Sequence, residues 1–297
     1  MVRLKLENVC KNFEGFEALK NVSFTVAAGE KVALLGHNGA GKTTLMKAIL
    51  GLQPHDGGRI EVMGAAPGSH AARMQVAYLP ENVAFHSSLT GREQIRLYLR
   101  LRGQPVELAD ELLERVGLEH VSRRRIGTYS KGMRQKVGLA QALIGNPALM
   151  ILDEPTSGLD PISRRKFYAI LDDMAARGAA ILLSSHALTE VEARTDRIVI
   201  LSKGQVVADD TLSGLRKEAG LPTHIRIAAK PGAADQVAAM LNAGRSNGVT
   251  VDLTCAPEDK LARLREIAAL GPKVRDLDVA PPSLDDIYDH FSRRAER

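Results

Sequence analysis

The chain has 297 residues, of which 44% are hydrophobic, and a formal net charge of +5 at pH 7. This length gives room for one large α/β domain and a small appended domain. No run of eighteen apolar residues occurs, and the segment Met1–Lys5 is too charged for a signal peptide, so we expect a cytoplasmic chain that does not span a membrane. Cys10 and Cys255 show neither metal-ligand spacing nor a redox motif.

The basic charge balance could indicate a nucleic acid or an anionic membrane as partner. However, no domain-scale basic stripe with interleaved aromatic residues accompanies it, and we expect no nucleic-acid partner. The one dense basic run is Arg123–Arg125. We interpret it as a solvated loop, with a docking patch for lipid headgroups or a partner as the alternative.

The first predicted elements are two strands. Apolar and polar side chains alternate with period two over residues 3–9 and 22–26, which is typical of half-buried antiparallel strands. A glycine-rich loop follows, between a buried-strand pattern at 30–35 and a helical pattern at 45–50. Its nine residues are Gly36, His37, Asn38, Gly39, Ala40, Gly41, Lys42, Thr43 and Thr44.

This strand–loop–helix segment predicts a phosphate cradle. The glycines allow backbone conformations in which successive N–H groups turn toward an anion at the start of a helix. Lys42 would reach the β- and γ-phosphates, and the Thr43 hydroxyl would ligate Mg²⁺. A nucleoside triphosphate is therefore the predicted ligand. The alternative is a glycine-rich turn in which Gly-Lys-Thr occurs by chance. That alternative does not account for the strand and the helix that flank the loop.

Helical patterns are predicted in the middle of the chain. Residues 89–118 are amphipathic with a helical period, and Thr90 with Glu93 forms a capped start. Further on, Ser130 and Gly132 open a second helical pattern that continues through 137–143. A Ser followed by a Gly at a helix start is another candidate anion site.

An apolar strand at 149–152 ends in two adjacent carboxylates, Asp153 and Glu154. Asp153 could hold Mg²⁺ or a water bound to it, and Glu154 could accept a proton from an attacking water. Alone, such a pattern usually marks an ordinary strand that leaves the core. Because it follows a phosphate loop in the same chain, it predicts a hydrolase.

The order of these three motifs resembles the ATP-binding cassette (ABC) family, and the resemblance extends over about residues 3–215. It implies an α/β, P-loop NTPase fold with a RecA-like core, an antiparallel β-subdomain and a helical subdomain at about residues 86–145. It also implies an ATPase that uses ATP and Mg²⁺ as a homodimer, with two ATP molecules sandwiched between the subunits.

The resemblance assigns roles to further residues. Asp160 matches the family's D-loop, which communicates between the paired sites, and His186 matches the switch histidine that contacts the γ-phosphate. A lone His after a strand is more often structural, and only its place in the series gives it this role. Glu154, His186 and Lys42 are thus the expected catalytic residues. The signature, which binds the γ-phosphate held by the opposite subunit, corresponds to Ser130, Lys131, Gly132 and Met133.

Four positions depart from the family pattern. Phe13 stands where a Tyr that stacks on adenine is more usual; it could instead pack in the core, and Phe16 competes for the same role. Glu81 replaces the Q-loop Gln and could still offer an oxygen to Mg²⁺, beside Thr43 and Asp153. In the signature, Lys131 and Met133 replace Gly and Gln, and the positive charge of the lysine suits a phosphate.

The chain ends in a second predicted unit. We expect the cassette to occupy residues 1–220, closed by a hairpin centred on 203–204. Residues 221–297 alternate three times between an apolar strand and a helix, which predicts a small C-terminal α+β domain. It contains no catalytic constellation, so we expect regulation, dimer contact or partner docking, with plain stabilisation as the alternative.

The resemblance implies an ATPase that drives an integral membrane permease of the ABC-2 type from the inner face of the cell membrane. In such transporters the helical subdomain and the Glu81 loop form a groove for a coupling helix of the permease. Segments 36–42 and 78–85 further resemble the NosF-type ATPases of nitrous oxide reductase maturation, which serve copper-site assembly with a membrane partner, NosY, and a periplasmic partner, NosD. The alternatives are a generic exporter ATPase for a lipid, drug or polysaccharide, a soluble ABC ATPase acting on ribosomes or DNA, and a nucleotide-gated scaffold without turnover.

Overall fold

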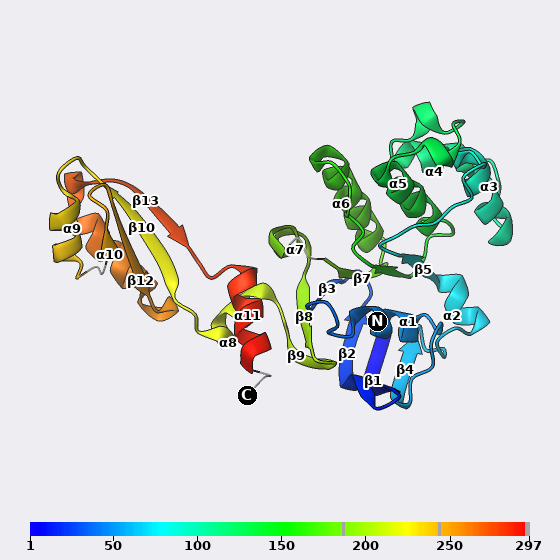
Figure 1. The fold of residues 1–297 in the computed structure, drawn as a ribbon, viewed down its shortest axis with the longest axis horizontal. Coiled ribbons are helices and arrows are strands. Elements are labelled where there is room, and N and C mark those ends of the chain that lie inside the picture. The colour runs from blue at the N-terminus through cyan, green and yellow to red at the C-terminus, as the bar shows by residue number, and fades with distance from the viewer. Residues whose placement is uncertain (186–187, 243–244, 295–297) are drawn as a thin grey trace. The chain divides into compact units, whose positions relative to one another are not determined.

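The computed structural model describes residues 1–185, 188–242 and 245–294. The chain divides into two compact units, Met1–Asp209 and Asp210–Arg297 (Figure 1). His186, the expected switch histidine, lies outside the described residues. Among the described residues, no helix has both the length and the apolar composition that crossing a membrane requires.

A three-stranded antiparallel sheet opens the first unit. Its strands are β1 (Val2–Phe13), β2 (Phe16–Ala27) and β4 (Gly57–Val62), in the order β2-β1-β4. The predicted strands at 3–9 and 22–26 are parts of the longer β1 and β2. These strands meet at a two-residue turn, Glu14-Gly15, in which both residues have positive φ, 46° and 93°. This is the turn whose twist matches a tight hairpin, and it places Phe13 opposite Phe16.

The second sheet of this unit has six strands in the order β5-β6-β7-β3-β8-β9. The pairs β5/β6, β6/β7, β7/β3 and β3/β8 are parallel. Their nearly continuous apolar sequences are buried, as expected for strands covered on both faces. The strands are β3 (Lys31–Leu35), β5 (Val76–Leu79), β6 (Leu149–Leu152), β7 (Ala180–Ser184), β8 (Arg197–Ser202) and β9 (Gln205–Asp210).

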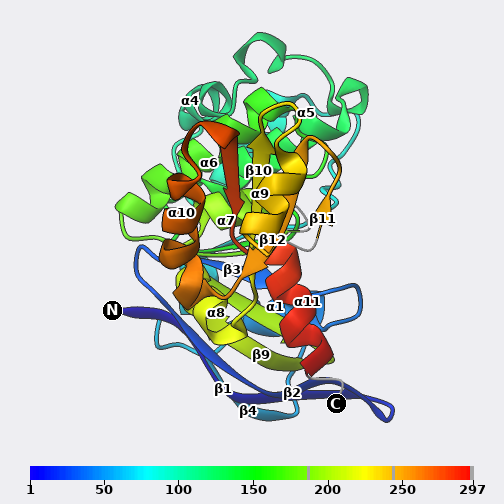
Figure 2. The same ribbon diagram turned by 90° about the vertical axis from the view of Figure 1, so that its left-hand side faces the viewer.

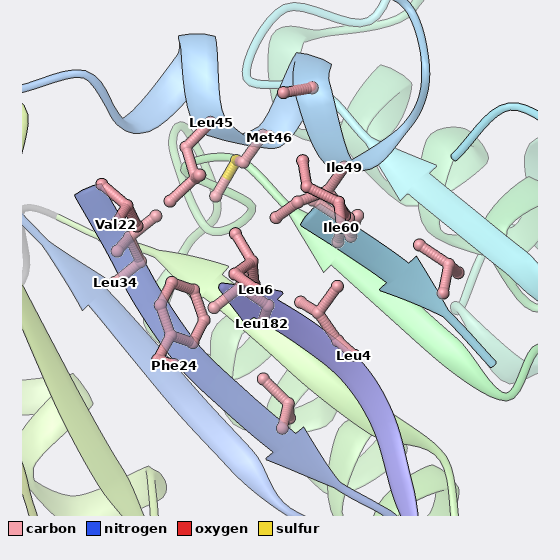
Figure 3. Close-up of a cluster of buried hydrophobic side chains, with 14 of the residues drawn as sticks. Leu4, Leu6, Val22, Phe24, Leu34, Leu45, Met46, Ile49, Ile60 and Leu182 are labelled. Carbon is pink, nitrogen blue, oxygen red and sulfur yellow. The ribbon is translucent and has the colours of Figure 1, made fainter. Parts of the chain in front are cut away.

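Parallel strands end at the same edge of a sheet, so the segments that follow β3, β6 and β7 lie together. Side chains of helix α1 (Lys42–Ile49) pack in one buried cluster with side chains of both sheets, as Figure 3 shows for Leu45, Met46 and Leu34 beside Phe24. This cluster fixes the start of α1, and with it the loop that precedes the helix, above the edge of the six-stranded sheet.

The remaining helices of the first unit include the expected helical subdomain. Thr90 and Glu93 form the predicted capping box, in which each side chain bonds the backbone N–H of the other residue. The helices are α2 (His70–Gln75), α3 (Gly91–Leu101), α4 (Leu108–Arg115), α5 (Lys131–Ala142), α6 (Pro161–Ala176) and α7 (Leu188–Arg194), with short 3₁₀ turns at Glu119–Val121 and Ile126–Thr128.

The second unit contains all six elements that the sequence predicts for it. The strands β10 (Thr223–Ala229), β12 (Thr250–Cys255) and β13 (Val274–Ala280), with the short β11 (Arg245–Ser246), form an antiparallel sheet in the order β11-β12-β10-β13. Helices α9 (Ala234–Met240) and α10 (Lys260–Ala269) lie in front of this sheet in Figure 2, and their buried side chains share its core.

The division between the units falls at Asp209, about one helix before the expected boundary at residue 220. That helix, α8 (Leu212–Ala219), packs with α11 (Leu284–Arg294) of the second unit. The Arg216 guanidinium on α8 donates to the backbone oxygen of Pro282 over 3.0 Å, just before α11. The sequence pattern does not reveal this pairing, because the two helices are far apart in the chain.

Candidate functional site

The glycine-rich loop follows β3 and ends at the start of α1. Gly39 and Gly41 have φ of 85° and 105°, a conformation that favours glycine. A Cβ at Gly41 would lie 2.7 Å from the backbone oxygen of Ala18, and one at Gly36 would lie 2.7 Å from that of Leu201. The close approach of neighbouring backbone therefore requires glycine at both positions. No side chain caps the N-terminus of α1, so its first N–H groups suit an anion.

Lys42 is the first residue of α1 and only 8% of its surface is exposed. Its ammonium group donates to the backbone oxygens of Gly36 and His37, the latter at 3.2 Å, and thus lies within the loop. Burial lowers the pKa of this amine, while the carboxylates of Glu154 and Asp153 act in the opposite direction. The charges of these two carboxylates therefore offset part of the cost of burying the lysine ammonium.

The two predicted carboxylates are held by a serine that the sequence interpretation left without a role. Ser184, fully buried at the end of β7, donates its hydroxyl to Oδ1 of Asp153 over 2.6 Å. The same hydroxyl accepts the backbone N–H of Glu154 over 3.0 Å. Glu154 has a φ of 46°, the left-handed region that non-glycine residues rarely adopt. One hydroxyl therefore orients the aspartate and secures the strained backbone of the glutamate.

The oxygen donors near the phosphate loop fit a magnesium ion. Oγ1 of Thr43 lies 3.5 Å from Oδ2 of Asp153, close to the distance of about 3 Å expected between adjacent ligands of octahedral Mg²⁺. No group of three or more His, Cys, Asp or Glu in the described part of the chain could form a metal cage. Magnesium is usually held by one or two protein oxygens together with substrate phosphates, so this sparse donor set suits it.

Residues of the phosphate loop and the carboxylates of Asp153 and Glu154 line one cleft of about 380 Å³. Both candidate aromatic residues line it, and so does Glu81, which replaces the Q-loop Gln. Gly36 and Ala40 of the loop are not among the described residues that line the cleft; Ala40 is buried. The lining residues are Phe13, Phe16, Ala18, His37, Asn38, Gly39, Gly41, Lys42, Thr43, Thr44, Glu81, Asp153 and Glu154.

The two aromatic side chains differ in how firmly they are held. The Lys11 ammonium lies 5.3 Å from the centre of the Phe13 ring and is fixed by Asp56 at 2.8 Å. The second carboxylate oxygen of Asp56 accepts the backbone N–H of Asn12 over 2.7 Å. Phe13 is 41% exposed, whereas Phe16 is 65% exposed. The Phe13 ring is thus held by a fixed cation, while a substantial part of its surface stays exposed.

The signature residues lie at the start of α5, away from the lining of this cleft. Ser130 is exposed and caps the helix by accepting the backbone N–H of Met133 over 3.2 Å. Lys131 donates to the hydroxyl of Ser157 over 2.8 Å. A Cβ at Gly132 would lie 2.7 Å from the backbone oxygen of Gly158. The start of the signature helix therefore packs against segment 155–160 of its own chain.

Asp160 caps helix α6. Its carboxylate accepts the backbone N–H groups of Ile162 and Ser163, at 3.0 and 2.9 Å, and the Ser163 hydroxyl at 2.5 Å. These hydrogen bonds, that of the Ser163 hydroxyl first, lower the pKa of Asp160 to about 2. The structure thus gives this residue a clear role in ending the loop and starting the helix.

An apolar groove of about 580 Å³ lies elsewhere in the first unit. Its lining comes from α1, α2, the segment that follows β5, α3 and α5. Side chains of Met74, Tyr98 and Leu101 contribute to it, and Leu101 is 72% exposed. The sequence analysis expects a docking groove between the helical subdomain and the Glu81 loop. Pro80 and residues 83–85 of that loop line this groove, whereas Glu81 lines the other cleft.

Known proteins are similar to this chain in both sequence and fold. The family described as ABC transporter matches residues 19–157. The linearmycin resistance ATP-binding protein LnrL of Bacillus subtilis (strain 168) is 31% identical, with 99% of each chain covered. The Nod factor export ATP-binding protein I of Rhizobium johnstonii is 34% identical, with 97% of this chain and 94% of that protein covered. A solved ATP-binding subunit of an ABC transporter is 36% identical, covers 73% of this chain and 93% of its own, and superimposes with a TM-score of 0.69.

These similarities confirm the fold class and the ATPase activity expected from the motifs. The phosphate loop, the paired carboxylates and the sheet edge that joins them are the parts such an enzyme needs. The chain belongs to the ABC transporter family, as a subunit that binds and hydrolyses ATP.

Proposed function

We propose that this protein powers an exporter, working as a homodimer that closes on ATP and drives an ABC-2 type membrane permease. Two relatives that match it over nearly their whole length are named for linearmycin resistance and Nod factor export. One observation supports the proposed dimer. Lys42 and Glu154 line the cleft, whereas Ser130 is not among the described residues that line it. A second copy would bring its own Ser130 to the phosphates.

The residues of the cleft would divide the chemistry between them. Lys42 and the N–H groups at the start of α1 bind the β- and γ-phosphates. Glu154 orients the attacking water and accepts its proton, a role that its position beside the phosphate loop supports. Thr43 and Asp153 would hold Mg²⁺, with Glu81 as a further oxygen donor, and the bound ion would neutralise charge on the phosphates. His186 is proposed to contact the γ-phosphate.

We assign the adenine platform to Phe13. Its ring lines the cleft and has over it a lysine that is itself fixed by Asp56. An aromatic ring held in place loses little freedom when a base stacks on it. Phe16, which is more exposed, would contribute less.

The signature and the D-loop would form the contact with the second copy. Ser130 and Gly132 offer the exposed start of α5 to the partner's γ-phosphate. Lys131 and Met133 are proposed to flank that phosphate, although the Lys131 ammonium also binds Ser157 within its own chain. Asp160 is proposed to lie near the interface, in addition to capping α6.

The permease would supply the membrane-spanning part of the transporter. The apolar groove that includes Tyr98 and Leu101 suits an amphipathic helix of such a partner. This arrangement would place the ATPase on the inner, cytoplasmic face of the cell membrane, as a peripheral subunit.

A narrower candidate is the NosF-type role in nitrous oxide reductase maturation. The sequence of segments 36–42 and 78–85 supports it, in particular His37 in the phosphate loop. In that case the permease would be NosY-like, a NosD-like protein would act in the periplasm, and the work would serve copper-site assembly. Co-purification of the permease from detergent-solubilised membranes distinguishes this role from export of a lipid, drug or polysaccharide.

Mixing two inactive variants tests the shared site. Lys42→Ala should lose ATP binding. Ser130→Asp should keep the helix cap, since Asp caps as well as Ser, but repel the partner's phosphate. A heterodimer of the two has one intact composite site, so an equal mixture should recover about a quarter of the parent ATPase activity if chains pair at random in a two-fold dimer.

The matched control is Ser69→Asp, the same change at the cap of α2, where Ser69 accepts the N–H of Ala72 over 3.2 Å. This variant should retain the parent activity. Heterodimers captured through two different affinity tags that show no activity above the sum of the separate variants would contradict the shared site. A parent protein that binds ATP without turnover would instead favour the nucleotide-gated scaffold.

A further inference from the structure

The contact between α6 and α7 joins two segments that flank the reaction site. α6 begins directly after segment 155–160, and α7 begins at Leu188, two residues after His186 in the sequence. The contact rests on polar side chains spaced four residues apart on each helix. On α6 these are Arg164, Tyr168 and Asp172, and on α7 they are Glu190 and Arg194.

Arg164 contacts both α7 and segment 155–160. Nη1 of its guanidinium forms an ion pair with Oε1 of Glu190 on α7. Nη2 of the same group donates to the backbone oxygen of Leu159 over 3.2 Å. Leu159 is a buried residue of segment 155–160. One rigid, planar group therefore holds this loop and α7 at a fixed separation.

Arg194 of α7 makes the second contact between the helices. The Arg194 guanidinium lies 5.7 Å from the centre of the Tyr168 ring and 3.7 Å from Oδ2 of Asp172. Tyr168 is almost fully buried, and burial, followed by the charge of Glu190, raises the pKa of its hydroxyl to about 12. This contact holds α7 against α6. It reaches segment 155–160 only indirectly, because the Tyr168 hydroxyl lies near the Thr156 side chain.

We propose that Arg164 is a positioning residue that couples segment 155–160 to α7 through Leu159 and Glu190. The inference rests on the proposed ATP-closed dimer, in which segment 155–160 meets the second copy. Closure of the dimer then shifts α7 together with segment 155–160, and α7 begins two residues after His186 in the sequence. Hydrolysis is thereby tied to completion of the dimer.

Replacing Arg164 with lysine distinguishes the coupling to Leu159 from the ion pair with Glu190. Arg164→Lys keeps the positive charge for Glu190 but has no second, coplanar N–H group for Leu159. The matched control is Arg194→Lys on α7, which weakens the helix contact but leaves the hydrogen bond between Arg164 and Leu159 in place. Both variants are made in the full chain.

Steady-state ATP hydrolysis gives the first readout. We expect Arg164→Lys to lower kcat about tenfold, the loss that one charge-assisted hydrogen bond in the transition state would cause, with KM and Tm close to those of the parent. Arg194→Lys should leave kcat within about twofold of the parent. A parent-like kcat in Arg164→Lys, or an equal fall in both variants, would overturn the coupling.

Hydrogen exchange of the nucleotide-free chain gives a second readout that needs no turnover. Arg164→Lys should speed exchange in peptides that cover both 155–160 and 188–194, whereas Arg194→Lys should speed it in 188–194 alone. Unchanged exchange in 155–160 would refute the link to Leu159. A parent protein without ATP turnover would contradict the proposed function, and exchange would then decide the coupling by itself.

Discussion

Ser184 offers a sharp test of how the carboxylates are held. Replacing it with alanine removes the hydroxyl that donates to Asp153 at 2.6 Å and that accepts the N–H of Glu154 at 3.0 Å. No water can easily replace this hydroxyl, because Ser184 is fully buried. The variant therefore leaves one buried donor without its acceptor and frees a carboxylate to rotate.

The magnitude follows from the kind of hydrogen bond that is lost. A hydrogen bond to a charged group contributes about 1.5–3 kcal/mol. If this stabilisation is present in the transition state, its loss lowers kcat by about ten- to a hundredfold. ATP affinity should fall by less than about fivefold, because Lys42 and the loop still bind the phosphates. The apparent affinity for Mg²⁺ should also fall, since Asp153 is no longer oriented.

The assay is steady-state ATP hydrolysis at saturating MgATP, with nucleotide affinity measured separately by fluorescence. Ser122→Ala serves as the matched control, because its buried hydroxyl donates a hydrogen bond to an uncharged acceptor, the backbone oxygen of Glu119, over 3.0 Å. That variant should lose about 1 kcal/mol of stability and keep the parent kcat. If Ser184→Ala also kept the parent kcat while losing only stability, the serine would not position the carboxylates.

Two further predictions concern the rim of the cleft and the start of α6. Phe13→Ala should weaken ATP binding by at least about fivefold, since stacking a base on an aromatic ring contributes about 1–3 kcal/mol. Phe16→Ala should weaken it less. Calorimetric titration that showed the reverse order would assign the adenine platform to Phe16 instead. Asp160→Ala should lower Tm at pH 7, because the pKa of this capping carboxylate is lowered from 3.8 to about 2 in the folded chain. A carboxylate whose pKa is lower in the folded than in the unfolded chain stabilises the fold fully only above its unfolded pKa. The difference in Tm between parent and variant should therefore shrink as the pH falls from about 4 to about 2. A difference that stays constant over this range would contradict the role of the charge.

Much of the site could be predicted because its chemistry is local in the sequence. The glycine spacing before Lys42 encodes a backbone path that few other residues could follow, and the structure shows the close approaches that require it. Likewise, two adjacent carboxylates after a buried strand must lie at the end of that strand. The capping box at Thr90 is local for the same reason.

The parts that sequence reasoning missed depend on neighbours in space. Ser184 meets Asp153 because β6 and β7 are adjacent and parallel, a fact that neither strand reveals alone. Phe13 and Phe16, which the sequence names as competitors for one role, both reach the cleft because a two-residue turn pairs them across a hairpin. Arg164 and Glu190 are 26 positions apart and meet only where α6 and α7 pack. The position of Lys131 beside Ser157 is equally a result of packing between separate segments.

The central claim is that ATP holds two copies of this chain together. Its most direct test is the mass in solution of Glu154→Gln, which should bind MgATP but not hydrolyse it, since Gln cannot accept the proton. Light scattering should show twice the chain mass of 32.1 kDa with MgATP and the single-chain mass without nucleotide. A mass of 32.1 kDa with saturating MgATP at every protein concentration would contradict the account.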